Sequence, residues 1–167
     1  MADSEKVELK QCLQVCVVVE DLDEAIERYW EMFGIGPWQI YTFAPPGLIE
    51  ATIRGEPKPY TMKLATAQVG SLQWELIEPL TGPSIYAEFL EEHGEGLHHV
   101  LCEVEDYDRA LAALDEQGIG VLMGGTWKGA TYAYLDTQKT LGTIVEIFKQ
   151  EPGFEMPEPE ATYPPST

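Results

Sequence analysis

The chain contains an internal repeat, and this repeat limits the folds that it can adopt. The segment VLCEVEDYDRALAAL, which begins at Val100, matches the segment VCVVVEDLDEAIERY, which begins at Val15. The identical pairs are Val15/Val100, Val19/Val104, Glu20/Glu105, Asp21/Asp106, Asp23/Asp108 and Ala25/Ala110. Such a repeat indicates two copies of one structural unit that pack on each other. Equivalent residues of the two copies are therefore expected to meet near a pseudo-twofold axis.

Each copy predicts a strand, a helix and three further strands. In the first copy LQVCVVV is typical of a strand, Asp21 or Asp23 can cap the helix that follows, and Gly34 ends it. The residues expected on the buried face of this helix are Ala25, Ile26, Tyr29, Trp30 and Phe33. In the second copy HHVLCEV is the strand, and the helix buries Leu111 and Leu114 and ends at Gly118. Segments of alternating polarity follow both helices, as in strands.

We therefore predict an α+β fold in which two tandem βαβββ modules, about residues 10–80 and 96–150, form a cup-shaped mixed sheet. Both modules belong to a single domain, residues 1–150. A short helix capped by Ser84 links them, and the insertion APPGLIEATIRGEPKP forms a loop or lid. Residues 151–167 are Pro-rich and acidic, which predicts a flexible tail with Phe154 and Tyr163 as docking points.

Composition excludes several classes of partner. Ten Lys and Arg against 29 Asp and Glu give a net charge of −19, which repels nucleic acid and anionic membranes. The three cysteines lie in apolar runs, as is typical of small buried side chains in a reducing compartment. The N-terminus lacks the apolar core of a signal peptide, and no run is long enough to span a membrane. We expect a cytoplasmic protein.

Strand parity predicts a polar group inside the cup. If Val100 and Cys102 pack under the helix, His99 faces the cup, and Gln14 is its equivalent in the first copy. Glu75 and Glu146 form a second equivalent pair, each a single carboxylate within an apolar strand. Two carboxylates, an imidazole and an amide oxygen can together bind a divalent cation. By the same parity His98 points away from the cup and is structural, and His93 lies in a surface loop.

These residues also carry a resemblance to a known family. Over about residues 10–150 the chain resembles the vicinal oxygen chelate superfamily of glyoxalases, bleomycin-resistance proteins and dioxygenases. The motifs are VVVEDLDEAIERYWEMFG, QWELIEPLTGPSIYAEFLEEHGEGLHHVLCEVEDYD and LGTIVEIF. The stretch ELIEPLTGPSIYAEFLEEHGEGLHHV is most similar to methylmalonyl-CoA epimerases.

The resemblance implies one divalent metal ion held by Gln14, Glu75, His99 and Glu146. Zn, Ni, Co, Mn or Fe suits these ligands, with Zn preferred. Bacterial glyoxalases and epimerases have histidine where this chain has Gln14. Eukaryotic-type glyoxalase I has the order glutamine, glutamate, histidine, glutamate around zinc. This set counts against a ring-cleaving dioxygenase, which needs two histidines and one carboxylate.

Family chemistry implies an isomerase, epimerase or lyase that acts through a metal-stabilised enolate of a small carbonyl or acyl substrate. Glu146 is the predicted base. An epimerase needs a second base, and Lys63, counted into the cup, and Glu50 in the insertion are the candidates. The alternative for Lys63 is a side chain that reaches the rim of the cup.

The remaining expectations concern substrate and assembly. The predicted cup wall is aromatic, which favours an apolar or aromatic substrate, and it consists of Trp38, Tyr41, Tyr60, Trp127 and Tyr132. A non-catalytic protein that binds a hydrophobic small molecule, as resistance proteins of this superfamily do, is the alternative function. We also expect a homodimer.

Overall fold

The computed structural model describes residues 6–165. The first half of the chain contains β1 (Leu9–Val18), α1 (Leu22–Phe33), β2 (Trp38–Phe43), β3 (Leu48–Ile53), β4 (Glu56–Pro57), β5 (Thr61–Val69) and β6 (Leu72–Thr81). α2 (Ile85–His93) joins it to β7 (Gly96–Val104), α3 (Tyr107–Glu116), β8 (Val121–Trp127), β9 (Ala130–Leu135), α4 (Gln138–Leu141) and β10 (Ile144–Gln150). The last strand is β11 (Ala161–Tyr163).

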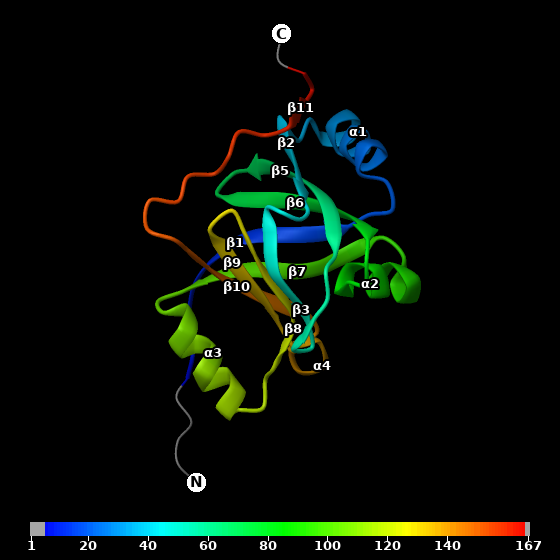
Figure 1. Ribbon diagram of the computed structural model, residues 1–167. Coiled ribbons are helices and arrows are strands. Elements are labelled where there is room, and N and C mark those ends of the chain that lie inside the picture. Colours follow the sequence, from blue (N-terminus) through cyan, green and yellow to red (C-terminus); the bar gives the residue numbers. More distant parts are fainter. Residues whose placement is uncertain (1–5, 166–167) are drawn as a thin grey trace.

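All strands join one curved sheet in the order β11-β2-β5-β6-β1-β7-β10-β9-β8-β3-β4 (Figure 1). β1 and β7, the first strands of the two modules, pair antiparallel at its centre. β6 runs parallel to β1, and β10 runs parallel to β7. This arrangement confirms the predicted α+β class with its large curved sheet. The two last strands flank the two first strands, so the four predicted ligand strands are neighbours.

Local sequence explains where the helices begin and end. The Asp21 carboxylate accepts a hydrogen bond from the backbone N–H of Glu24, and Gly34 ends α1 with a φ of 65°. Asp106 caps α3 in the same way, and Ser84 caps α2 as predicted. The predicted buried face of α1 is wrong at its last turn, where Trp30 is 37% exposed and Phe33 72% exposed. The apolar cluster under α1 extends only as far as Tyr29, so the last turn lies beyond it.

The insertion and the tail supply strands that local patterns did not predict. β3, within the insertion, pairs antiparallel with β8 of the second module. β11, within the tail, pairs antiparallel with β2 of the first module. The expectation of a flexible tail is therefore wrong for residues 161–163. Both modules thus have an additional strand at their outer edge, and Tyr163 docks against the cluster under α1 as expected.

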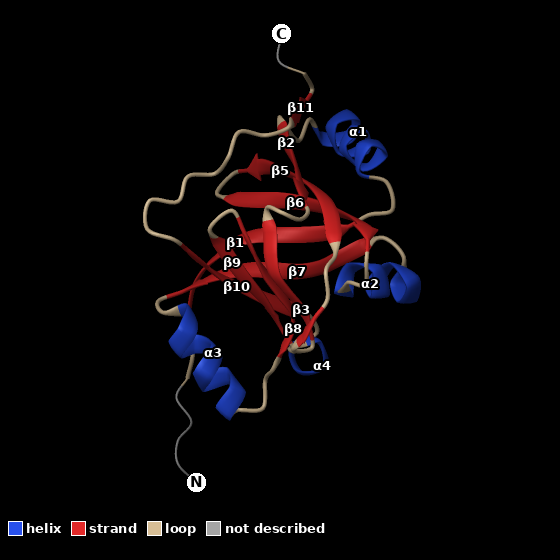
Figure 2. Cartoon of the chain, in the orientation of Figure 1, coloured by secondary structure: helices blue, strands red, loops and turns tan. Residues whose placement is uncertain are grey.

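The sheet separates three apolar clusters. One lies under α1, a second under α3, and the third on the opposite, concave side, which we call the cup. Figure 2 shows α1 and α3 at opposite ends of the molecule, outside the strands. Alternation along β1 places Val17 under α1, whereas Cys16 and Val18 face the cup. Within residues 6–165, no helix has both the length and the apolar composition needed to cross a membrane.

Candidate metal centre

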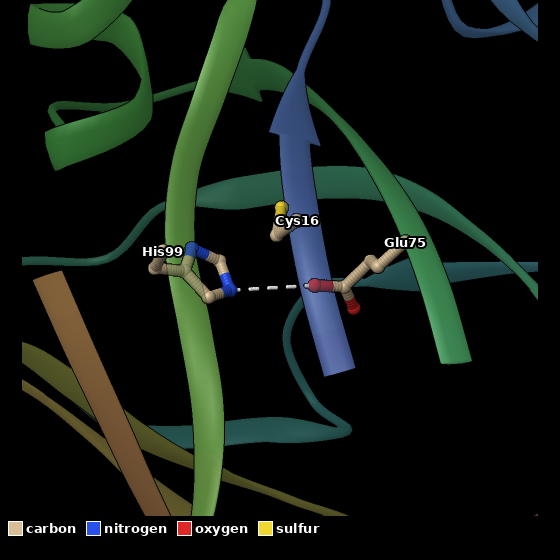
Figure 3. Close-up of side chains that lie close together, drawn as sticks. All are labelled: Cys16, Glu75 and His99. Atoms are coloured by element: carbon tan, nitrogen blue, oxygen red, sulfur yellow. Dashed lines mark ion pairs between the residues drawn. The ribbon is translucent and has the colours of Figure 1, made fainter. Parts of the chain in front are cut away.

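The four central strands bring acidic and imidazole side chains together on the floor of the cup. In the strand register Cys16 of β1 lies between Glu75 of β6 and His99 of β7. Glu146 of β10 lies beside Leu101, two residues along β7 from His99. Because directly paired residues point to the same face of a sheet, all of these side chains face the cup. Figure 3 shows Cys16 between His99 and Glu75.

Glu75, His99 and Glu146 form what we call the acid–histidine cluster. Nε2 of His99 lies 3.1 Å from Oε2 of Glu146 and 3.4 Å from Oε2 of Glu75. The His99 side chain is 0% exposed and the two carboxylates are each 8% exposed. Nε2 of His99 and Oε2 of Glu75 are buried and have no hydrogen-bond partner among the described residues. Buried polar atoms without partners indicate a bound ion or water, and these two converge on one point.

The electrostatics of the cluster favour a cation. Burial opposes a positive charge on His99, but Cys16, Glu146 and Glu75 outweigh burial and raise the pKa of His99 well above its ordinary value. Burial also raises the pKa of Glu146, and the negative charge of Glu75 adds to this effect, while His99 opposes it. A divalent cation can take the place of the bound protons, and imidazole and carboxylate are suitable ligands for it. The residues present therefore fit a metal ion.

His98 contacts His99 and the cup residues Tyr86 and Tyr134, so its predicted orientation away from the cup is wrong. Cys16 pairs with His99 and Val17 pairs with Leu97, which leaves His98 as the extra residue of a β-bulge in β7. A bulge interrupts the alternation of side chains and re-aims them. Nδ1 of His98 lies 2.8 Å from Nδ1 of His99, in hydrogen-bonding contact.

The hydrogen bonds around His98 assign the protons on both rings. Burial lowers the pKa of His98 to about 3, while a backbone hydrogen bond at Ile85 opposes this effect. A backbone hydrogen bond raises an imidazole pKa when the ring donates, so the neutral His98 ring donates to the Ile85 carbonyl oxygen. Nδ1 of His98 must then accept a hydrogen bond from Nδ1–H of His99. In a neutral His99 ring this leaves the lone pair on Nε2, where a metal can bind.

Gln14 lies on the same face but is already engaged. It is 6% exposed, as predicted for a residue in the cup. Its Nε2 donates a hydrogen bond of 2.6 Å to Oε1 of Gln73 on the neighbouring strand. The sequence analysis did not identify Cys16 as a site residue, although it is fully buried and its Sγ, a Glu75 oxygen and a His99 nitrogen lie within 4.8 Å of one another. Its position two residues after Gln14 was the available signal.

The predicted second bases do not face the cup. Thr66 pairs with Glu75, so Met62, Leu64 and Thr66 share the cup side of β5. Lys63 therefore lies on the other side, where it forms an ion pair of 2.9 Å with Asp23. The expected placement of Lys63 is wrong because the two-residue turn after Val69 pairs Thr66 with Glu75. The even-numbered residues of β5 therefore face the cup, and Lys63 does not. Glu50 is exposed, and its carboxylate accepts a hydrogen bond from Thr126.

Aromatic side chains form much of the cup wall. Tyr41, Tyr60, Trp127 and Tyr132 lie there as predicted. Trp38 instead packs in the cluster under α1, because Trp38 and Tyr41 lie on opposite sides of β2. Two tyrosines that the sequence analysis missed are Tyr86 and Tyr134, whose hydroxyl groups form a hydrogen bond of 2.6 Å.

The pKa shifts predict that a metal stabilises the protein more at higher pH. Raised pKa values of His99 and Glu146 mean that the metal-free fold holds protons more tightly than the unfolded chain. This tighter proton binding stabilises the metal-free fold at pH values below the ordinary pKa values, 6.5 for His99 and 4.5 for Glu146. The stabilisation is lost as the pH rises through the pKa values of the folded protein. Metal binding replaces these protons. We expect the increase in Tm caused by zinc to grow between about pH 5 and 9, as measured by thermal unfolding; a constant increase would contradict this.

Comparisons with known proteins agree with the fold described above. A family model described as the Glyoxalase/Bleomycin resistance protein/Dioxygenase superfamily matches residues 13–134. The chain is 35% identical over 89 residues to the uncharacterized protein YqjC of Bacillus subtilis (strain 168). That match covers 52% of this chain and 64% of the relative, so the chain spans less than two thirds of the relative's length.

Solved structures of methylmalonyl-CoA epimerases share the fold. The enzyme of Streptomyces coelicolor in complex with 2-nitronate-propionyl-CoA has a TM-score of 0.64 at 20% identity, covering 90% of this chain and 100% of that chain. The epimerase of Mycobacterium tuberculosis has a TM-score of 0.59 at 22% identity, with coverages of 89% and 93%. With the repeat, the curved sheet and the family match in agreement, the chain belongs to the glyoxalase, bleomycin-resistance and dioxygenase superfamily.

Proposed function

We propose that the protein is a metal-dependent isomerase or lyase that moves a proton next to the carbonyl group of a small substrate. The observation that carries this proposal is the convergence of two buried ligand atoms without a hydrogen bond, Nε2 of His99 and Oε2 of Glu75, which lie 3.4 Å apart beside the Glu146 carboxylate. A protein that only binds an apolar molecule has no need of two buried carboxylates, whose desolvation is costly.

Each residue of the acid–histidine cluster has a role in this proposal. A divalent cation held there would supply Lewis acidity, which draws electrons from a carbonyl oxygen and makes the adjacent C–H group more acidic. His99 and Glu75 would hold the cation. Glu146 accepts the proton, and its raised pKa makes it a stronger base than an exposed carboxylate. The Tyr134 hydroxyl opposes part of this rise in the pKa of Glu146.

The cup favours a reaction with one base. An epimerase removes a proton from one face of a carbon and delivers one to the other face, which requires two acid–base groups. Lys63 and Glu50 are directed elsewhere. Burial raises the pKa of Tyr60, Tyr132 and Tyr134 far above the ordinary value, so these hydroxyls act as hydrogen-bond donors. We therefore infer an isomerase-type reaction in which Glu146 removes the proton and returns it.

The proposed substrate is a small, largely uncharged carbonyl compound. The structural neighbours are named for methylmalonyl-CoA, an acyl-CoA thioester with several phosphates. A net charge of −19 disfavours such a polyanion here. Tyrosine hydroxyls above an apolar wall suit a substrate with a carbonyl group and an apolar or aromatic body.

Metal content and proton exchange test the proposal together. Plasma mass spectrometry of untagged protein should find near one equivalent of a transition metal, which His99→Ala loses and the surface variant His93→Ala retains. Nuclear magnetic resonance should then show exchange of α-protons with deuterated water for members of a panel of ketones, aldehydes and methylmalonyl-CoA. A protein that takes up no metal from Zn, Ni, Co or Mn solutions would rule out this function.

Binding without catalysis is the second candidate function. The observation that favours it is the apolar cup, whose cluster contains five tyrosines besides Trp127 and aliphatic side chains. Metal-free protein that binds hydrophobic compounds, and catalyses no exchange, would support this alternative.

The homodimer and the cytoplasmic location stay predictions. All members of the acid–histidine cluster come from one chain, so the proposed chemistry needs no partner subunit.

A further inference from the structure

We propose that the Cys16 thiolate is a ligand of the metal, so that Cys16, Glu75 and His99 hold the cation and Glu146 stays available as the base. This inference rests on the proposed metal-dependent function. It replaces the glutamine ligand that the sequence analysis placed at position 14 with a sulfur ligand two residues later on the same strand.

The strand register puts Cys16 at the centre of the site. β1 lies between β6 and β7, and Cys16 is the residue of β1 that pairs with both Glu75 and His99. Its side chain projects from the floor of the cup between the other two (Figure 3). Cys16 is 0% exposed, so bulk water does not compete with its sulfur as a ligand for a cation.

The ligand atoms are already close. Sγ of Cys16, a carboxylate oxygen of Glu75 and a ring nitrogen of His99 all lie within 4.8 Å of one another. In a tetrahedral zinc site with bonds of about 2.0–2.3 Å, neighbouring ligand atoms are roughly 3.3–3.5 Å apart. Movements of about 1 Å would produce this geometry, and side-chain rotations of that size leave the strands in place.

Two buried atoms of other residues also indicate a bound ion at the same place. Nε2 of His99 and Oε2 of Glu75 are buried without a hydrogen-bond partner. Gln14, in contrast, pairs with Gln73 and Leu101 in the sheet, whereas Cys16 pairs with Glu75 and His99 themselves. Cys16 therefore has the better position to complete the coordination.

A thiolate ligand changes which metals the site selects. As the metal–sulfur bond forms, the Sγ–H bond breaks and its proton leaves to solvent. Thiolate favours zinc, cobalt and iron over manganese and magnesium, which prefer oxygen ligands. The inference thus narrows the metals proposed for this site to those that accept sulfur.

Cobalt(II) provides the test, because thiolate ligation gives a sulfur-to-cobalt charge-transfer band in the near ultraviolet. We expect this band in the wild-type full-length protein loaded with one equivalent of cobalt, and its loss in Cys16→Ser. Cys12→Ser and Cys102→Ser are the matched controls and should keep it, as should Gln14→Leu. X-ray absorption spectroscopy of the zinc-loaded wild-type protein does not depend on the folding of any variant. It should show one sulfur at about 2.3 Å from zinc.

The outcomes separate this inference from the proposed function. Bound cobalt without the band, only nitrogen and oxygen around zinc, or a band that survives Cys16→Ser would overturn the thiolate ligand and leave the metal site intact. No binding of cobalt or zinc by wild type would overturn both.

Discussion

Replacing Glu146 by glutamine is expected to lower α-proton exchange by about 10²–10⁴-fold, the usual contribution of a general base. The amide has nearly the shape of the carboxylate but cannot accept the proton. Its position beside His99, at 3.1 Å, makes it the carboxylate that the proposed reaction depends on. Exchange is measured by nuclear magnetic resonance in deuterated water, on protein whose metal content has been determined.

The matched control for this variant is Glu103→Gln. Glu103 also lies in a central strand, β7, but its side chain is exposed. Glu103→Gln should retain wild-type exchange. Wild-type exchange in metal-loaded Glu146→Gln would show that another group carries the proton.

Replacing His98 by leucine is expected to weaken metal binding by about 10–100-fold, as for other residues that orient a metal ligand. Leucine fills the space but cannot accept the hydrogen bond from Nδ1–H of His99, now at 2.8 Å. The His99 ring then loses both its fixed orientation and the tautomer that presents Nε2 to the cluster. Competition with a chromophoric chelator gives the metal affinity of each variant.

The variant His98→Asn distinguishes the role of His98 in orienting the His99 ring from its role in packing. The asparagine side-chain oxygen can accept the hydrogen bond, so His98→Asn should recover part of the lost affinity. The ¹⁵N resonances of His99 report its tautomer directly, and they should shift in His98→Leu. Equal metal affinity in wild type and His98→Leu would assign His98 a packing role against Tyr86 and Phe89, whose rings it contacts.

The internal repeat was sufficient to predict which residues group together by the pseudo-twofold symmetry of the two modules. Equivalent positions of two copies approach one axis, so Glu75, His99 and Glu146 could be brought together without knowing any contact. Helix caps such as Asp21 and Ser84 were predictable because a cap is a local interaction.

The error at His98 arose where alternation was extended across a β-bulge, and the error at Lys63 arose where the register of a regular hairpin was counted wrongly. One extra residue in β7 turns His98 toward His99, and one residue of register in the β5–β6 hairpin moves Lys63 out of the cup. A shift by one residue exchanges the two faces of a strand. Alternation from Gln14 places Cys16 on the cup side, but its pairing with both Glu75 and His99 depends on a strand register that a single sequence does not show.

The crossing of β3 to the second module has a consequence for synthesis on the ribosome. β3 leaves the ribosome early but its partner β8 is made more than 60 residues later, and β1 likewise waits for β7. The first module therefore cannot finish its own sheet while it is the only part synthesised. The acid–histidine cluster needs Glu146 of β10 as well, so the nascent chain completes it only when translation is nearly finished. A truncated first half would expose strand edges that promote aggregation.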